Sequence, residues 1–185
     1  MSSPGYSDSF VLMWRLADFE ARQLEAELIE PAHLLLGICK SVDVDLTTVV
    51  PLAGSLAERD EALEDLLREV RRLRRIFDNC AIDARRFRKA YRDRLGRPVS
   101  GSPASALLHR SESSHAIFKA AEQLAAGREV FPVYLFGLVL KVEDPVRDEV
   151  LGAQGVQFGA LAQAAELEIL AAQSAGDDPG KPLLN

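Results

Sequence analysis

The sequence contains little sulfur and no long apolar run. Its 185 residues include two methionines and two cysteines, and neither Cys39 nor Cys80 belongs to a CxxC pair. Two isolated cysteines do not make a disulfide framework. The longest apolar run, around residues 131–140, is far shorter than the roughly 20 residues that span a bilayer. A basic region followed by an apolar core is also missing from the N-terminus, so we expect a cytoplasmic protein and no membrane partner.

The sequence also offers few residues for catalysis. Its three histidines, His33, His109 and His115, do not pair at metal-ligand spacing with a third ligand nearby. Serines precede His115, but a serine-rich segment is typical of a helix N-cap, and no oriented acid or oxyanion-binding feature accompanies it. We therefore expect no catalytic residues, no metal and no cofactor.

The residues that are present predict a single all-α domain. Hydrophobic residues make up 48% and charged residues 27% of the chain, as in ordinary soluble domains. Apolar residues recur at helical spacing, and no segment alternates with a period of two for long. We predict helices over 10–28, from 31 to 39, over 43–50, over 56–95 with a break near 78–79, over 117–126, over 132–140, from 145 to 151 and over 158–172.

Two stretches about one hundred residues apart are alike. One reads IEPAHLLLGI over 29–38, and the other reads VFPVYLFGL over 130–138. Each follows an amphipathic helical stretch, and each carries a proline, Pro31 or Pro132, that suits the first turn of a helix because its missing N–H costs little there. A repeated unit of this kind predicts two similar helical halves.

The pattern from Glu20 to Gly37, which ends in HLLLG, resembles the N-terminal repeat of the Clp family of AAA+ unfoldases, and residues 111–161 resemble the second repeat. This resemblance implies two pseudo-symmetric four-helix Clp-N-type repeats. When the two prolines are aligned, Tyr134 takes the place of the histidine and Gly137 falls one residue early. The residues implied to carry the repeat signature are His33, Leu35, Gly37, Pro132, Leu135 and Gly137.

The resemblance also suggests boundaries. We expect a flexible N-terminus over 1–8, a single Clp-N-like domain over 9–173 and a disordered tail over 174–185. Within the domain, repeat one covers 9–55, a basic helical insert covers 56–97, a Pro/Gly/Ser-rich linker covers 98–106 and repeat two covers 107–173. The insert is longer and far more basic than the connector between repeats that is usual in the family.

The basic run is the most unusual feature of the sequence. Residues 68–97 include twelve basic and four acidic side chains, so this segment carries +8 and the rest of the chain carries −14 of a total of −6. Three interpretations stay open: internal compensation by acidic helices, a docking surface for an acidic protein partner, and nucleic-acid binding. The candidate protein-binding residues are Arg71, Arg72, Arg74, Arg75, Arg85, Arg86, Arg88, Lys89 and Arg92.

The sequence contains no GxxxxGK[ST] phosphate loop, so the ATPase modules of the Clp family are absent from it. The resemblance then implies a non-catalytic module that docks adaptors, substrates, a Clp-type AAA+ unfoldase or a protease subunit. Some Clp N domains bind phosphoarginine through an acidic residue before the signature histidine, but that position is Ala32 here and Val133 in the second unit. The alternative is a nucleic-acid-associated regulator that uses the Arg-rich segment 68–97.

Overall fold

The computed structural model describes residues 5–45, 56–96 and 108–175, and the side chains in these ranges except those of 56–62 and 175. The fold in these ranges is all-α, as predicted, apart from two strands of two residues each. The helix predicted over 43–50 lies mostly outside the described residues, and so does the linker. The elements are α1 (Asp8–Gln23), β1 (Leu28–Ile29), α2 (Pro31–Asp43), α4 (Leu56–Asn79), α5 (Ala84–Leu95), β2 (His109–Arg110), α6 (Glu112–Ala125), α7 (Pro132–Leu140), α8 (Pro145–Ala153) and α9 (Phe158–Ala175).

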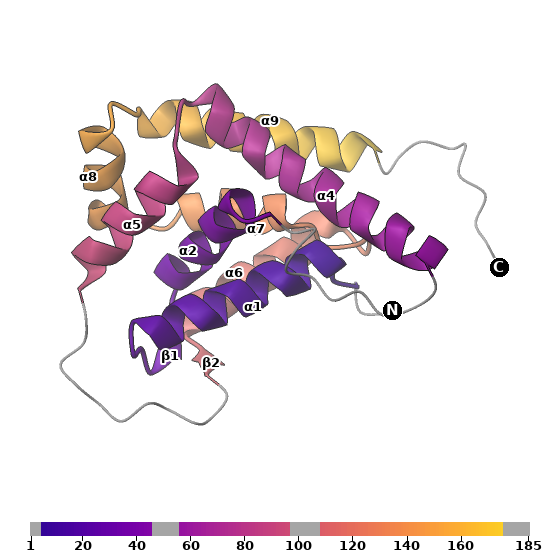
Figure 1. Ribbon diagram of the computed structural model, residues 1–185, viewed down its shortest axis with the longest axis horizontal. Helices are drawn as coiled ribbons and strands as arrows, with labels where there is room; N and C mark the ends of the chain where they lie inside the picture. Colours follow the sequence, from indigo (N-terminus) through magenta and orange to yellow (C-terminus); the bar gives the residue numbers. More distant parts are fainter. Residues whose placement is uncertain (1–4, 46–55, 97–107, 176–185) are drawn as a thin grey trace.

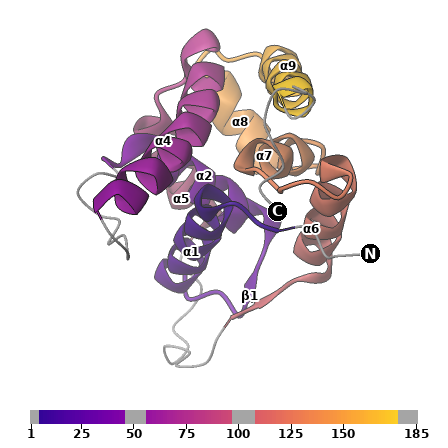
Figure 2. The ribbon, with the colours of Figure 1, turned by 90° about the vertical axis from the view of Figure 1, so that its right-hand side faces the viewer.

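The helices form three levels around a central pair. Helices α2 and α7 contact each other in the middle, α1 and α6 lie on one side of them, and α4 and α9 cross on the other side (Figures 1 and 2). Helices α5 and α8 pack together at one end of the molecule. The central position of α2 and α7 explains their composition, because a helix that is covered all round has to be apolar on every face. Residues 33–39 and 132–137 are buried without interruption.

The two halves are tied together by two short parallel contacts. Strand β1 pairs with β2, and Tyr6 forms a parallel bridge with Val130. The N–H of Ser111 donates to the carbonyl of Ile29 at 3.1 Å, and the N–H of Ser7 donates to the carbonyl of Val130 at 3.2 Å. In each case, the segment before the first helix of one half is bound to the segment before the second helix of the other half.

These contacts correct the expectation of a flexible N-terminus for residues 5–8, whereas residues 1–4 lie outside the described residues. Residues from Gly5 onward are held in place, because the carbonyl of Gly5 accepts a hydrogen bond from Val130 at 2.9 Å. Tyr6 stacks on Phe10 with 4.7 Å between ring centroids, and the hydroxyl of Ser7 caps α1 by accepting from the N–H of Phe10. At the other end, α9 continues through residues 174 and 175, which the sequence assigned to the tail.

Helices α4 and α8 end in the same kind of turn. Ala81 has φ 53° and Gly155 has φ 76°, so both adopt the left-handed conformation that ends a helix. The N–H of the next residue then bonds back five positions, from Ile82 to the carbonyl of Phe77 at 2.8 Å and from Val156 to the carbonyl of Leu151 at 3.0 Å. The two turns are 74 residues apart in the chain.

The same offset matches α5 with α9. Phe87 and Tyr91 correspond to Leu161 and Ala165, and all four are buried. We therefore propose that α4 and α5 are the third and fourth helices of repeat one, so that this repeat extends to about residue 95. The segment predicted as an insert is then part of the repeat, and the additional length is the first part of α4, residues 56–70, which precedes the portion that matches α8.

Candidate functional site

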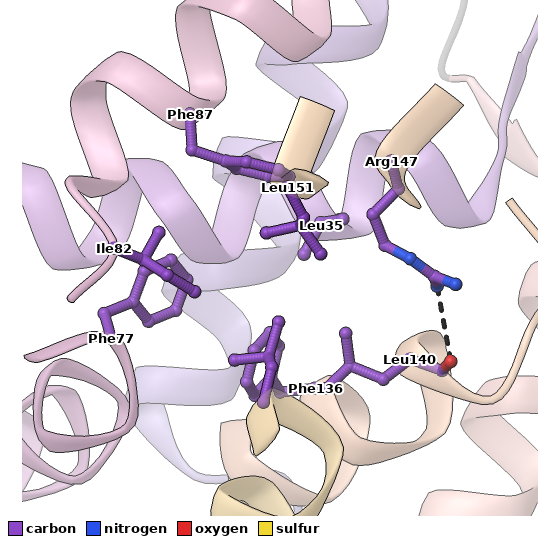
Figure 3. Close-up of a pocket in the computed structure, with 9 residues that line it drawn as sticks. Leu35, Phe77, Ile82, Phe87, Phe136, Leu140, Arg147 and Leu151 are labelled. Carbon is purple, nitrogen blue, oxygen red and sulfur yellow. Dashed lines mark hydrogen bonds between the residues drawn. The ribbon is translucent and has the colours of Figure 1, made fainter. Parts of the chain in front are cut away.

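The centre of the molecule is filled by side chains from both halves. Three matched pairs, Leu35 with Phe136, Phe77 with Leu151, and Phe87 with Leu161, surround a small void, which Figure 3 shows. The volume of the void is about 10 Å³, room for one water molecule at most. The side chains around it are apolar except for Arg147. This void is too small for a ligand, and the candidate site has to be sought at the surface.

Arg147 is a buried cation whose hydrogen bonds are used inside the fold. Its side chain reaches the end of α7, where Nη1 donates to the carbonyls of Val139, Leu140 and Val142 at 3.0–3.3 Å (Figure 3). Val139 and Leu140 are the last two residues of α7 and Val142 follows the helix, so the guanidinium lies at a helix C-terminus, where a cation is favoured. Its Nε donates to Asp148 at 2.8 Å, so Arg147 is a structural capping residue.

His33 closes the N-terminus of α2. The side chain is 6% exposed, and its Nδ1 accepts a hydrogen bond from the N–H of Glu30 at 2.9 Å. Burial lowers the pKa of His33, which favours the neutral ring that can accept this bond. Tyr134 occupies the matching position in α7, where it is buried and its ring contacts that of Phe131 at a tilt of 52°. The first repeat thus keeps a polar cap where the second repeat has an aromatic contact.

The two signature glycines have different surroundings. A Cβ on Gly37 would lie 2.7 Å from the backbone nitrogen of Ala17, so this glycine allows α2 to pack closely on α1. A Cβ on Gly137 would meet the end of the Ile169 side chain on α9. Because the helices align by their prolines, Gly137 matches Leu36 rather than Gly37, and this one-residue difference explains why the two glycines face different helices.

The basic segment contributes to an ion cluster around Glu20. The Glu20 side chain is fully buried on α1 and contacts three cations. Arg88 Nη1 lies 3.1 Å from Oε1, Lys40 Nζ lies 3.7 Å from Oε1, and Arg92 bonds to Oε2. Arg88 also donates to Asp43 at 3.0 Å. Sequence reasoning placed Glu20 in a helical pattern but could not identify these partners.

Other members of the basic segment also have partners within the fold. Arg75 forms a bidentate pair with Glu168 of α9, with Nε–Oε1 and Nη2–Oε2 distances of 2.9 and 2.8 Å. Arg72 pairs with the largely buried Glu69, and Arg74 donates to the carbonyl of Val42 at 2.7 Å. Arg72, Arg75, Arg88 and Arg92 are thus paired with carboxylates of the same chain, whereas the partner of Arg74 is a neutral backbone carbonyl.

A smaller set of cations remains at the surface. Arg71, Arg85 and Arg86 are exposed, and among the residues that the structure describes none of the three has a carboxylate partner. Lys89 is exposed and forms only a solvent-exposed pair with Asp93 at 3.5 Å, which is a weak interaction. We define the α5 face as Arg85, Arg86 and Lys89, which lie together on the outer side of one helix.

Thiols and tyrosines in the interior are not activated. Burial raises the pKa of the Cys39 thiol, so this group stays protonated and packs as a small apolar side chain. Burial and the hydrogen bond to Asp144 raise the pKa of Tyr91. Within the described ranges, no three His, Cys, Asp or Glu side chains are grouped so that they could hold a metal ion. Nor is any described helix both long and apolar enough to cross a membrane.

The fold defines the class of protein: two pseudo-symmetric four-helix units packed about α2 and α7, which is the fold of Clp N-terminal domains. The N-terminal domain of Hsp104 from Candida albicans superimposes with a TM-score of 0.56 at 11% identity, over 87% of this chain and 89% of that one. The N-terminal domain of the caseinolytic protease associated chaperone ClpD from Arabidopsis thaliana gives 0.55 at 17% identity, over 92% and 97%.

A protein from structural investigations of a malarial protein secretion system gives a TM-score of 0.56 at 13% identity, over 89% of this chain and 94% of that one. No protein-family model and no curated protein match the sequence. The likeness therefore lies in the fold, and it confirms the fold predicted from the repeat signature.

Proposed function

We propose that this chain is a non-catalytic protein-binding module that docks adaptors, substrates or a Clp-type AAA+ partner, in the cytoplasm. The observation that carries the proposal is the double four-helix fold, because the N-terminal domains of two chaperones share it over nearly the whole chain. The surroundings of the interior groups support it. Arg88 and Arg147 are bonded to groups of the same chain, and the central void is too small for a substrate.

We propose the α5 face as the docking surface for an acidic segment of the partner. Arg85 and Arg86 are exposed and have no carboxylate partner in the described part of the chain, so their charges can be neutralised by a ligand without breaking an internal ion pair. Opposite charge across an interface raises the association rate and makes binding sensitive to salt. Arg88 and Arg92 lie on the same helix and form ion pairs with the buried Glu20, so they are not counted as part of this face.

The proposal is tested by capture from the native cell followed by binding measurements. The full chain is immobilised, and proteins enriched on it are compared with those on an Arg85→Glu/Arg86→Glu variant. A matched control, Lys119→Glu/Lys141→Glu, changes the net charge equally at two exposed positions, one on α6 and one directly after α7. We expect a Clp component or client that binds the wild type and the control, binds the α5 variant at least tenfold more weakly, and dissociates at high salt.

Repeated captures that enrich no Clp component, adaptor or client would refute the unfoldase-linked function. A partner whose binding is equal for all three proteins would refute the docking surface. The nucleic-acid alternative is less favoured, because seven of the eleven arginines in 68–97 contact carboxylates or carbonyls of the same chain. Salt-sensitive binding of labelled DNA or RNA would restore it.

A further inference from the structure

Helix α9 presents an outer face that is almost free of charge. Leu167 is 61% exposed and Leu170 is 59% exposed, the highest values among the large hydrophobic side chains that the structure describes. Of the exposed residues on this helix, Glu166 is the one that carries a charge. The exposed residues are Gly159, Ala160, Gln163, Glu166, Leu167, Leu170, Ala171 and Ser174.

The other half of the molecule provides an internal comparison. With the 74-residue offset, Arg86, Lys89 and Asp93 of α5 match Ala160, Gln163 and Leu167 of α9, and all six are exposed. The fold therefore tolerates charges at these outward positions and does not require apolar residues there. The uncharged residues at these positions of α9, where α5 has charged ones, indicate that α9 has a partner which α5 does not have.

The spacing of the α9 face indicates the kind of partner. Ala160, Gln163, Leu167, Leu170 and Ser174 follow one another at intervals of three, four, three and four residues, which is the spacing of the seam along which two helices pack. This set, the α9 seam, has two leucines at its middle and small or uncharged residues at its ends. It fits another helix of similar length with a low charge.

We propose that the partner is a second copy of this chain, with the two α9 seams packed antiparallel about a twofold axis. In this arrangement Leu167 of one copy contacts Leu170 of the other, and a twofold interface is self-complementary by construction. The chain carries a net charge of −6, so two copies repel each other overall. The α9 seam contains no charged residue, and Glu166 is the one exposed acidic residue of α9 beside it, so two seams can meet with little repulsion. The antiparallel direction is favoured because the two helix dipoles then oppose each other.

The size of the α9 seam determines how strongly two copies are expected to associate. The seam spans 14 residue steps, about 21 Å of helix, so the pair buries less than the roughly 1,200 Å² of a standard stable interface. A weak, concentration-dependent dimer is therefore expected. Self-association uses α9 and partner docking uses the α5 face, so the two proposals can fail separately, and the Arg85→Glu/Arg86→Glu variant should dimerise like the wild type.

The first test is sedimentation equilibrium of the full chain over a wide concentration range. The wild-type mass should rise from 20.3 kDa toward twice that value, and Leu167→Asp/Leu170→Asp should weaken association at least tenfold. The control, Ala116→Asp/Gln123→Asp, adds the same charge at exposed positions of α6 and should behave like the wild type. Circular dichroism confirms that each variant is folded. A wild-type chain that stays monomeric at the highest concentration, or a control that loses dimerisation equally, overturns the proposal.

The second test determines the direction of the helices. Chains carrying Leu167→Cys and chains carrying Leu170→Cys, both with the partly exposed Cys80 replaced by serine, are mixed and oxidised with a mild thiol oxidant. An antiparallel pair forms the mixed disulfide in preference to either homodisulfide. A preference for homodisulfides, or no preference, overturns the antiparallel interface.

Discussion

Glu20 offers the sharpest test of how the basic segment is held. Its carboxylate is fully buried, whereas the side chains of Arg88 and Arg92 are 16% and 34% exposed. Removing one partner from a buried ion pair costs about 3–5 kcal/mol, because the remaining charge is left without compensation. Arg88 keeps Asp43, and Arg92 can turn partly toward water. For Glu20→Leu we therefore expect a loss at the lower end of this range, about 3 kcal/mol of the free energy of unfolding.

Replacing the whole cluster should cost less than breaking it. When the capping residues Ser7 and Ser111 are aligned, Glu20 matches Leu124, and the 74-residue offset matches Arg88 with Ala162. The second half therefore carries apolar residues at both positions. Buried ion pairs exchanged for apolar residues of similar size are often neutral. The variant Glu20→Leu/Arg88→Met/Arg92→Met should therefore recover more than half of the loss seen for Glu20→Leu alone.

The assay is urea unfolding followed by far-ultraviolet circular dichroism, with the free energy obtained by linear extrapolation. The control is Arg85→Met, on the same helix, which is exposed and should change stability by less than about 0.5 kcal/mol. If Glu20→Leu is as stable as the control, the cluster does not hold α5 against α1. If the triple variant is less stable than Glu20→Leu, the unpaired charges of Arg88 and Arg92 are not the cause of the loss in stability. That result would contradict the prediction.

Two further predictions concern the repeat signatures. Gly37→Ala should cost about 3 kcal/mol of unfolding free energy, since the added Cβ meets the α1 backbone. Gly137→Ala should be nearly neutral, because its Cβ meets the movable end of the Ile169 side chain. Equal losses of the two variants in urea unfolding would contradict this. Because burial lowers the pKa of His33 in the folded state, the unfolded chain binds the proton first as pH falls. Stability should decline below about pH 6.5, and His33→Gln should reduce that decline; an unchanged slope would contradict the assignment.

The helices could be predicted because their spacing and caps are local properties. Pro31 and Pro132 begin α2 and α7, as the sequence indicated. The side chain of Ser111, in the serine-rich segment before His115, caps α6, and Asp144 caps α8. A helix start depends on a few adjacent residues, so a single sequence carries the signal. The hydrogen bond from the backbone of Glu30 to the His33 ring is local in the same sense.

The proposed match of α4 and α5 to α8 and α9 could not be predicted from the sequence, because the signals that indicate it are weak in residues 56–97. The turn after α8 contains Gly155, an ordinary end signal, whereas the equivalent residue after α4 is Ala81, which takes the left-handed conformation although it has a Cβ. The match of α5 to α9 is also hard to recognise in the sequence, because the two helices are both apolar only at their buried positions and α5 is highly charged elsewhere. The contacts of Arg88 and Arg92 with Glu20 join residues 68 and 72 positions apart, and no local pattern encodes them.

The two halves thus differ in where they carry charged side chains, although their folds are similar. In the first half, charge is used in the interior, where Glu20 holds α5 against α1, and the outer side of α5 keeps its arginines. In the second half, the matching helix carries one charged residue, Glu166, among its exposed positions and presents two leucines. Helix α9 lies against α4 on one side of the molecule, whereas α5 lies at one end beside α8 (Figure 1). A dimer formed through α9 would therefore leave both α5 faces open, and two linked faces bind a partner with repeated acidic segments more tightly than one face does.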